Sequence, residues 1–359
     1  MTTEAIAGNT DFPVQPLTEN LLQPERGKLT ITELDLYRKG WVSVYITMTH
    51  WCNLQCPHCY DEYAPRSGLS TEQGAKIIEE VESVDMPKYF YDLSGGELMG
   101  MKNWEEMLGM FLATGKDVAV NTNGTLINEK TVKTLARMNE EHPNKLFLSV
   151  SLDSHDPETN KESRPGSASN KVFKGMELLK ENDIRFRAAV TLTSKNIDTI
   201  DDTVRFILNN YTKEFIVGVI RPVFYMTPET EKILVSREDA LDTMYKLLAL
   251  KEELGDFEMY HCFNADGETF CEAGRDRIHI LPDGNITACY TLQTKDQYVG
   301  NIYEEPLSDI LGRMQETHRN RDNKYLVCEN QHTIYGEPPH RLGKTMPNAS
   351  NFIPLSEIK

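Results

Sequence analysis

Three cysteines in one short segment are the residues of this sequence best suited to metal chemistry. They are Cys52, Cys56 and Cys59, spaced C-x3-C-x2-C, and they follow an apolar run from Val42 to Met48. Thiolates are soft ligands that favour iron–sulfur clusters and zinc. Because a [4Fe–4S] cluster normally takes four cysteines, this loop would leave one iron open for a small chelating molecule.

A structural zinc site is the alternative for these cysteines. It would need a fourth ligand in a closed tetrahedral arrangement, and His50 or His58 is near enough in sequence to supply one. Zinc-knuckle ligands usually come in pairs that repeat at a distance, whereas these three cysteines stand alone. The spacing therefore favours an iron–sulfur cluster.

The loop resembles the cysteine loop of the radical S-adenosylmethionine (radical SAM) superfamily, C-x3-C-x-φ-C, with His58 as the aromatic φ. The resemblance implies that the amino and carboxylate groups of SAM bind the open iron. It also implies that the reduced cluster cleaves SAM to a 5′-deoxyadenosyl radical, which takes a hydrogen from the substrate. The fold that it implies is a partial (β/α)6 TIM-like barrel, and the matching segments run from about residue 40 to 330.

From residue 41 onward, strand-like and helix-like segments alternate. The predicted strands are 42–48, 89–93, 118–121, 146–152, 186–192 and 215–219, and the predicted helices are 71–84, 104–112, 128–138, 171–181, 197–209 and 237–253. Alternating βα units imply parallel strands with right-handed crossovers, hence an α/β fold. Periodicity alone does not separate the partial barrel from a doubly wound open sheet.

Candidate site residues follow several of these strands, where ligands of parallel α/β folds bind. After the second strand comes the run Ser94-Gly95-Gly96-Glu97. It resembles the G-G-E-P segment that binds the SAM amino group, with Leu98 in place of the proline. Asn121 and Asn123 lie in a segment that resembles T-N-G-x in the SAM pocket. Each segment might equally make only a turn.

The fourth strand carries Ser149, Ser151 and Asp153 on one face by alternation. The resemblance assigns Ser151 to the SAM ribose, and Asp153 matches the S-x-D end of that strand. It also assigns Arg164 to the SAM carboxylate, which a guanidinium fork suits, although a surface arginine is the plain alternative. Further contacts are expected near 191–193 and at Arg221-Pro222.

A second group of cysteines follows residue 255. Cys271 and Cys289 flank a predicted β-hairpin with an Asp283-Gly284 turn. Twelve residues separate Cys271 from Gly284 and four separate Gly284 from Cys289, which resembles the Twitch extension, a short form of SPASM. The resemblance implies one auxiliary [4Fe–4S] cluster, because the further cysteine run of a full SPASM domain is missing. A zinc ribbon is disfavoured because paired C-x2-C spacing is absent.

The ligands that fit this auxiliary cluster are Cys271, Cys289 and Cys328. Cys262 or His332 is the candidate fourth ligand, and otherwise one iron stays open to substrate. Cys262 has two alternative roles: a buried structural thiol, or a catalytic hydrogen donor to a substrate radical.

The chain has 359 residues, a net charge of −17 and no apolar run long enough to cross a membrane. Seven cysteines without a secretory signal predict metal ligands in a cytoplasmic protein. Neither nucleic acid nor a membrane is expected as a partner. The expected divisions are an arm (1–40), the barrel (41–255), the auxiliary-cluster extension (256–330) and an irregular tail (331–359).

Two enzyme classes fit these features. The first is a maturase that crosslinks, epimerises or oxidises a ribosomally made peptide, which is common among families with such extensions. The second is dehydrogenation, decarboxylation or rearrangement of a sugar, aminoglycoside or nucleotide-like metabolite. Either would need a reducing partner such as flavodoxin or ferredoxin. An iron–sulfur carrier without SAM cleavage is the non-enzymatic alternative, and the ordered segments that resemble SAM contacts argue against it.

Overall fold

The computed structural model describes residues 42–61, 68–86, 88–220, 228–254, 258–261, 274, 277–291, 293 and 295–320. The expected arm and tail lie outside these residues, and so does the contact expected at Arg221-Pro222. None of the helices in the described ranges is long and apolar enough to span a membrane.

One sheet organises the described chain. Its order is β10-β9-β8-β1-β2-β3-β4-β5-β6-β7. The strands are β1 (Val42–Thr49), β2 (Tyr89–Gly95), β3 (Val118–Thr122), β4 (Leu146–Ser151), β5 (Phe186–Leu192), β6 (Glu214–Val219), β7 (Glu258–His261), β8 (Arg277–Ile280), β9 (Asn285–Thr287) and β10 (Gly300–Asn301).

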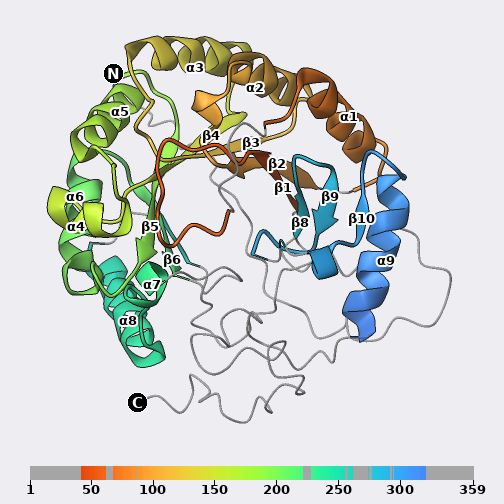
Figure 1. The fold of residues 1–359 in the computed structure, drawn as a ribbon. Helices are drawn as coiled ribbons and strands as arrows, with labels where there is room; N and C mark the ends of the chain where they lie inside the picture. The colour runs from red at the N-terminus through yellow and green to blue at the C-terminus, as the bar shows by residue number, and fades with distance from the viewer. Residues whose placement is uncertain are drawn as a thin grey trace.

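Strands β1 to β7 pair in parallel and in sequence order. A doubly wound sheet would reverse direction at a switch point, and none occurs in this run. The sheet therefore curves into a partial barrel, as the resemblance implied, and Figure 1 shows it as an open crescent.

Helices cover the outer side of the crescent (Figure 1). The α-helices are α1 (Thr71–Glu82), α2 (Trp104–Ala113), α3 (Glu129–Glu141), α4 (Pro157–Ser163), α5 (Ser169–Glu181), α6 (Ile200–Asn210), α7 (Pro228–Glu231), α8 (Arg237–Leu254) and α9 (Leu307–Asn320). Short 3-10 turns occur at Leu98–Gly100, Ile197–Thr199 and Lys295–Gln297. Ser70 caps α1 in a capping box with Gln73.

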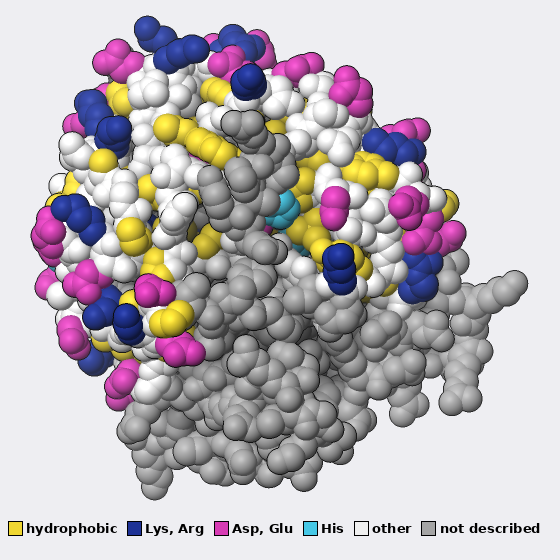
Figure 2. Space-filling view, viewed as in Figure 1, with side chains coloured by type: hydrophobic (Ala, Val, Ile, Leu, Met, Phe, Trp, Pro, Cys, Tyr) yellow, Lys and Arg dark blue, Asp and Glu magenta, His cyan; other side chains and the backbone are white. Residues whose placement is uncertain are grey.

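The apolar core lies between the sheet and these helices. Along β5, residues that point outward are buried, whereas alternate residues on the inner face are partly exposed. Strands β3 and β6 repeat this alternation. On the outer rim, charged side chains of both signs are interspersed over the helices (Figure 2). The concave inner face is thus the side of the sheet that a ligand can reach.

The sequence missed α4, the short helix α7 and β7. Helix α4 reads Pro-Glu-Thr-Asn-Lys-Glu-Ser, which has no apolar periodicity, and its signals are instead the Asp156 N-cap and Pro157 at its first turn. Strand β7 adds a seventh parallel strand beyond the six that were predicted.

The predicted hairpin is present as β8 and β9, with Gly284 in the turn at φ 86°. It does not stand apart from the barrel, because β8 pairs in parallel with β1 from Ser43↔Arg277 to Ile46↔Ile280. The expected boundary between residues 255 and 256 therefore falls within a single sheet.

Candidate active site

The cysteine loop leaves the carboxyl end of β1. At its two ends, His50 Nδ1 lies 2.6 Å from Asp61 Oδ1, so this pair closes the base of the loop. Within it, the Cys59 N–H donates to the Cys56 carbonyl at 3.0 Å. The three thiols are thus held in one short turn at the edge of the sheet where the sequence placed them.

Gly95 and Gly96 allow this loop to lie directly on the end of β2. Gly96 N–H donates to Thr49 O at 2.5 Å, and Glu97 N–H donates to Trp51 O at 2.8 Å. A Cβ on Gly96 would overlap the Trp51 carbonyl, and Gly95 has φ 113°. The N–H groups of a SAM amino group can only donate, so the acceptors that this segment offers to it are carbonyl oxygens.

The Glu97 carboxylate connects the ends of β2 and β3. It is fully buried and accepts hydrogen bonds from Thr122 Oγ1 and the Asn123 N–H, both at 2.8 Å. Burial raises the pKa of this carboxyl, and those donors oppose the rise. Its side chain therefore joins the ends of these two strands. Ser94, three residues earlier, forms a hydrogen bond with Tyr60 at 2.9 Å.

Asn123 contacts the cysteine loop. Its Nδ2 donates to Asn53 Oδ1 at 2.9 Å and lies 3.5 Å from Cys52 Sγ, to which the Leu54 N–H also donates at 3.4 Å. Hydrogen bonds to the sulfurs help to set the potential of an iron–sulfur cluster. Asn121 instead points along the inner face and donates to Asp92 Oδ1 at 2.6 Å.

Asp153 and Arg164 form a buried ion pair beside the loop. Arg164 Nε lies 2.9 Å from Asp153 Oδ2, and Ser163 Oγ donates to the same carboxylate at 2.7 Å. Burial alone would raise the pKa of Asp153, but Arg164 and His58, 3.9 Å away, hold it below its ordinary value. Burial lowers the pKa of His58 to about 4, so that side chain is neutral near pH 7.

Ser151 lies at the end of β4 and is partly exposed on the inner face. No hydrogen bond joins its hydroxyl to the described part of the chain, in contrast to Ser149, which accepts one from Arg187 at 3.1 Å. The contact of Ser151 with the SAM ribose stays a prediction.

The donor set fits a cluster. Burial raises the pKa of Cys56 to about 11 and of Cys59 to about 12, and Cys59 keeps access to solvent although protein atoms crowd around it. Arg164 opposes the shift at Cys56, and bound iron would displace the thiol protons. In the described ranges no three His, Cys, Asp or Glu side chains are placed to hold one metal ion.

Of the second cysteine group, only Cys289 is described. It is buried just after β9, with its Sγ 3.4 Å from Thr291 Oγ1. Cys262, Cys271, Cys328 and His332 lie outside the described residues, so the ligand set and the roles of Cys262 stay predictions.

Sequence reasoning missed the aromatic and charged residues of the inner face, among them Tyr45, Tyr60, Tyr290 and Asp92. Tyr45 had a signal, because Ser43, Tyr45 and Thr47 alternate with apolar residues along β1 in the same way as the polar stripe of β4. Tyr290 had none, since its contacts with Tyr45 and Tyr60 join distant segments.

Comparison with known families decides what this arrangement is. Residues 46–207 match the Radical SAM superfamily, and residues 271–330 match the iron–sulfur cluster-binding SPASM domain. The chain contains a radical SAM domain and a SPASM domain. Its two matched domains imply [4Fe–4S] clusters and SAM as cofactors, and Cys271, Cys289 and Cys328 all fall within the second match.

Individual relatives agree. The chain is 27% identical over 275 residues to the antilisterial bacteriocin subtilosin biosynthesis protein AlbA of Bacillus subtilis, which covers 73% of this chain and 58% of AlbA. It is 30% identical over 186 residues to an AdoMet-dependent heme synthase of Methanosarcina barkeri, covering 50% and 49%. The chain thus spans about half the length of these relatives.

A solved structure shares the fold. Streptococcus suis SuiB bound to its precursor peptide SuiA superposes with a TM-score of 0.65 at 18% identity, over 78% of this chain and 66% of SuiB. This likeness supports the partial barrel as the fold of this chain.

Proposed function

We propose that this protein is a radical SAM enzyme that modifies a ribosomally synthesised peptide by crosslinking, epimerisation or oxidation. The observation that carries the proposal is the cysteine loop at the carboxyl end of β1, bonded to Asn123 on one side and next to the Asp153–Arg164 pair on the other. When bound there, a reduced [4Fe–4S] cluster supplies the electron that splits SAM.

The chain's own residues would bind and orient SAM. Arg164, held by Asp153, presents a guanidinium beside Cys56 and is the proposed partner of the SAM carboxylate. Ser151 is the proposed contact of the ribose, and the carbonyl oxygens after Gly95 receive the amino group. Neutral His58 packs against Asp153 and adds no charge to the site.

The substrate would approach along the inner face. That face is partly exposed and carries Asp92, Asn121 and Arg187, so it can hold polar groups of a peptide next to the loop. AlbA and SuiB are both named with a peptide product or substrate, which supports the peptide class over others.

A small metabolite is the second candidate substrate, favoured by the heme synthase among the relatives. We further propose one auxiliary cluster on Cys271, Cys289, Cys328 and Cys262, a flavodoxin or ferredoxin as reductant, and a cytoplasmic location that keeps these thiols reduced. The net charge of −17 supports a partner other than nucleic acid.

Anaerobic reconstitution with iron and sulfide, followed by dithionite and SAM, tests the activity. The wild type should form 5′-deoxyadenosine, whereas the Cys52/Cys56/Cys59 triple Ala variant should form none and keep roughly half of the iron. Cleavage by the triple variant would overturn the assignment. A short peptide encoded beside the gene would then be incubated with the enzyme in deuterated water and analysed by mass spectrometry. Loss of hydrogen or uptake of deuterium by the peptide would support the peptide class, and an unchanged peptide would favour the metabolite class.

A further inference from the structure

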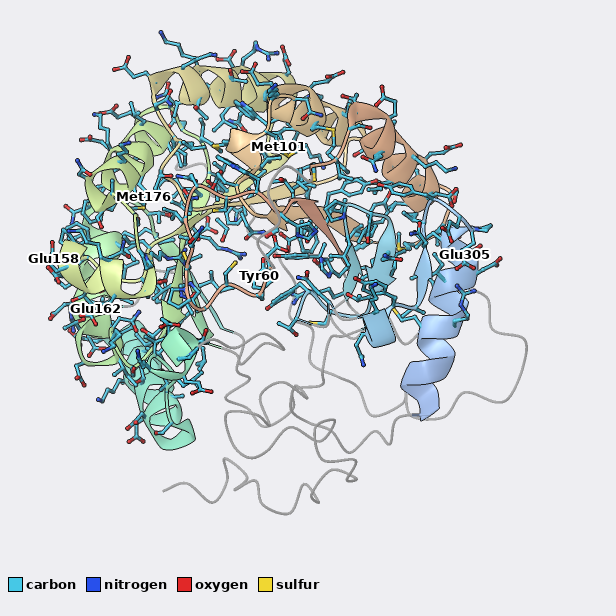
Figure 3. All side chains as sticks on the ribbon, viewed as in Figure 1. Tyr60, Met101, Glu158, Glu162, Met176 and Glu305 are labelled. Carbon is cyan, nitrogen blue, oxygen red and sulfur yellow. The ribbon has the colours of Figure 1, made fainter. Side chains whose placement is uncertain are left out.

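The two cysteine-bearing segments of this chain touch through aromatic side chains. Tyr60 directly follows Cys59, and Tyr290 directly follows Cys289. Their ring centroids lie 4.7 Å apart at an interplanar angle of 51°. Tyr60 is labelled in Figure 3, where it lies inside the crescent near β8 and β9. The contact joins the loop of the first cluster to the strand end that carries the buried cysteine of the extension.

A third ring locks this contact to the sheet. The Tyr45 centroid lies 5.0 Å from that of Tyr290 and 6.4 Å from that of Tyr60. The hydroxyls of Tyr45 and Tyr60 are hydrogen-bonded, and the Tyr60 hydroxyl lies 2.9 Å from Ser94 Oγ. On β8, the Arg277 guanidinium lies 4.9 Å from the Tyr290 ring centre. Both tyrosines are therefore fixed against β1, β2 and β8.

Gln293 binds the backbone of both segments at once. Its Nε2 donates to the Tyr290 carbonyl at 2.8 Å and to the Tyr60 carbonyl at 3.3 Å. A side-chain amide has two N–H donors, so one is directed to each segment. A shift of one cysteine segment would break a hydrogen bond to the other.

We propose that Tyr60, Tyr290 and Gln293 form a joint through which the cluster-binding extension positions the SAM-cluster loop. The proposal rests on the proposed function, and it adds that the two cluster sites are coupled. Metal ligation at Cys289 fixes the segment that carries Tyr290, and Tyr290 then restrains Tyr60 beside Cys59. Coupling between binding sites is reciprocal, so loss of the auxiliary site should weaken SAM binding although Cys289 does not contact SAM.

The test is a double-mutant cycle on SAM affinity, read from the change that SAM causes in the electron paramagnetic resonance spectrum of the reduced first cluster. Cys289→Ala and Tyr290→Leu should each weaken SAM binding on the order of fivefold or more. The double variant should be no weaker than either single variant, because both remove the same coupling. Tyr290→Phe keeps the ring and should bind SAM as the wild type does.

Tyr303→Leu is the matched control. Tyr303 lies in the same extension, against the Gly284 turn, and within the described residues it makes no hydrogen bond or ring contact with residues 52–61. Tyr303→Leu should leave SAM affinity unchanged. Gln293→Leu, which removes only the hydrogen bonds from Gln293 to the Tyr60 and Tyr290 carbonyls, should weaken SAM binding. The joint would be overturned if the losses of SAM affinity in Cys289→Ala and Tyr290→Leu were additive. It would also be overturned if Tyr303→Leu lost as much SAM affinity as Tyr290→Leu.

Amide hydrogen exchange over residues 52–61 keeps the joint testable apart from the proposed function. If the wild type binds no SAM, the proposed function fails, and the joint is then judged on exchange alone. Faster exchange of this loop in Tyr290→Leu than in Tyr303→Leu supports the joint, and equal exchange in the two variants refutes it.

Discussion

Among single residues, Asp153 has the largest share in ordering the site. Its two oxygens receive the Thr191 N–H at 2.9 Å, the Ser163 hydroxyl at 2.7 Å and the Arg164 guanidinium. With no exposed surface, the carboxylate has no water to replace a lost partner. The residue that the sequence matched only to the end of a strand is therefore held by three separate partners.

Asp153→Asn should lower the free energy of unfolding of the cluster-free protein by about 3–5 kcal/mol, because it leaves the buried Arg164 without a counter-charge. Urea unfolding followed by circular dichroism measures the change.

Asp117→Asn provides the control for that experiment. Asp117 pairs with Lys145 at 2.9 Å on the surface, where both side chains are about two-fifths exposed. Exposed pairs contribute about 0–1 kcal/mol, so this variant should differ little from the wild type. Equal losses in the two variants would mean that the Asp153 pair adds no more than a surface pair.

Among elements, β8 connects the extension to the barrel through a buried histidine. His279 Nε2 lies 2.8 Å from Thr47 Oγ1 on β1, and its Nδ1 lies 3.1 Å from Thr287 Oγ1 on β9. Burial, with the nearby Arg277 adding to it, lowers the pKa of His279 to about 3. The imidazole is thus neutral in the folded protein across the whole neutral and mildly acidic range.

This histidine predicts a loss of stability on acidification. In the unfolded chain its pKa is about 6.5, so below that pH the unfolded state binds a proton that the folded state does not. The stability is present above pH 6.5 and falls by about 1.4 kcal/mol per pH unit below it. Urea unfolding at pH 7.5 and 5.5 should therefore show a larger loss for the wild type than for His279→Gln. The same loss in both proteins would remove His279 as the cause.

Most elements could be predicted because each has a local signal. Val42–Met48 is an apolar run, and helix α1 has Ser70 as its cap and an apolar stripe. The exceptions are instructive: α4 lacks an apolar face, and the parallel pairing of β8 with β1 has no local signature, because it joins residues more than two hundred positions apart.

The same division holds for the site. The spacing of Cys52, Cys56 and Cys59 is a local pattern, and so is Gly95-Gly96 after a strand. The partners that these residues find in space are not local. Glu97 meets Thr122, Arg164 meets Asp153, and Tyr60 meets Tyr290 only after folding. A sequence pattern thus indicated which residues matter, while packing between distant segments determined what their side chains do.

At the scale of the whole molecule, we expect the continuous sheet to make barrel and extension one cooperative unit. Ile286 on β9 is fully buried in the same apolar core that includes Leu148 on β4, and four strands, β8, β1, β2 and β3, lie between them in the sheet. If the extension were a separate domain, a cavity there would leave β4 unaffected. If the sheet unfolds as one, the cavity lowers the free energy of opening for every strand.

Ile286→Ala should lower the free energy of opening by about 2–5 kcal/mol, the range for such a truncation in a core. Native-state hydrogen exchange of the slowest amides measures it in each strand separately. The decrease should be equal for β9 and for β4, because both exchange through global unfolding. Leu254→Ala, at an exposed position at the end of α8, should change neither. A decrease confined to β8–β10 would show instead that the extension opens without the barrel, in spite of the shared β1–β8 ladder.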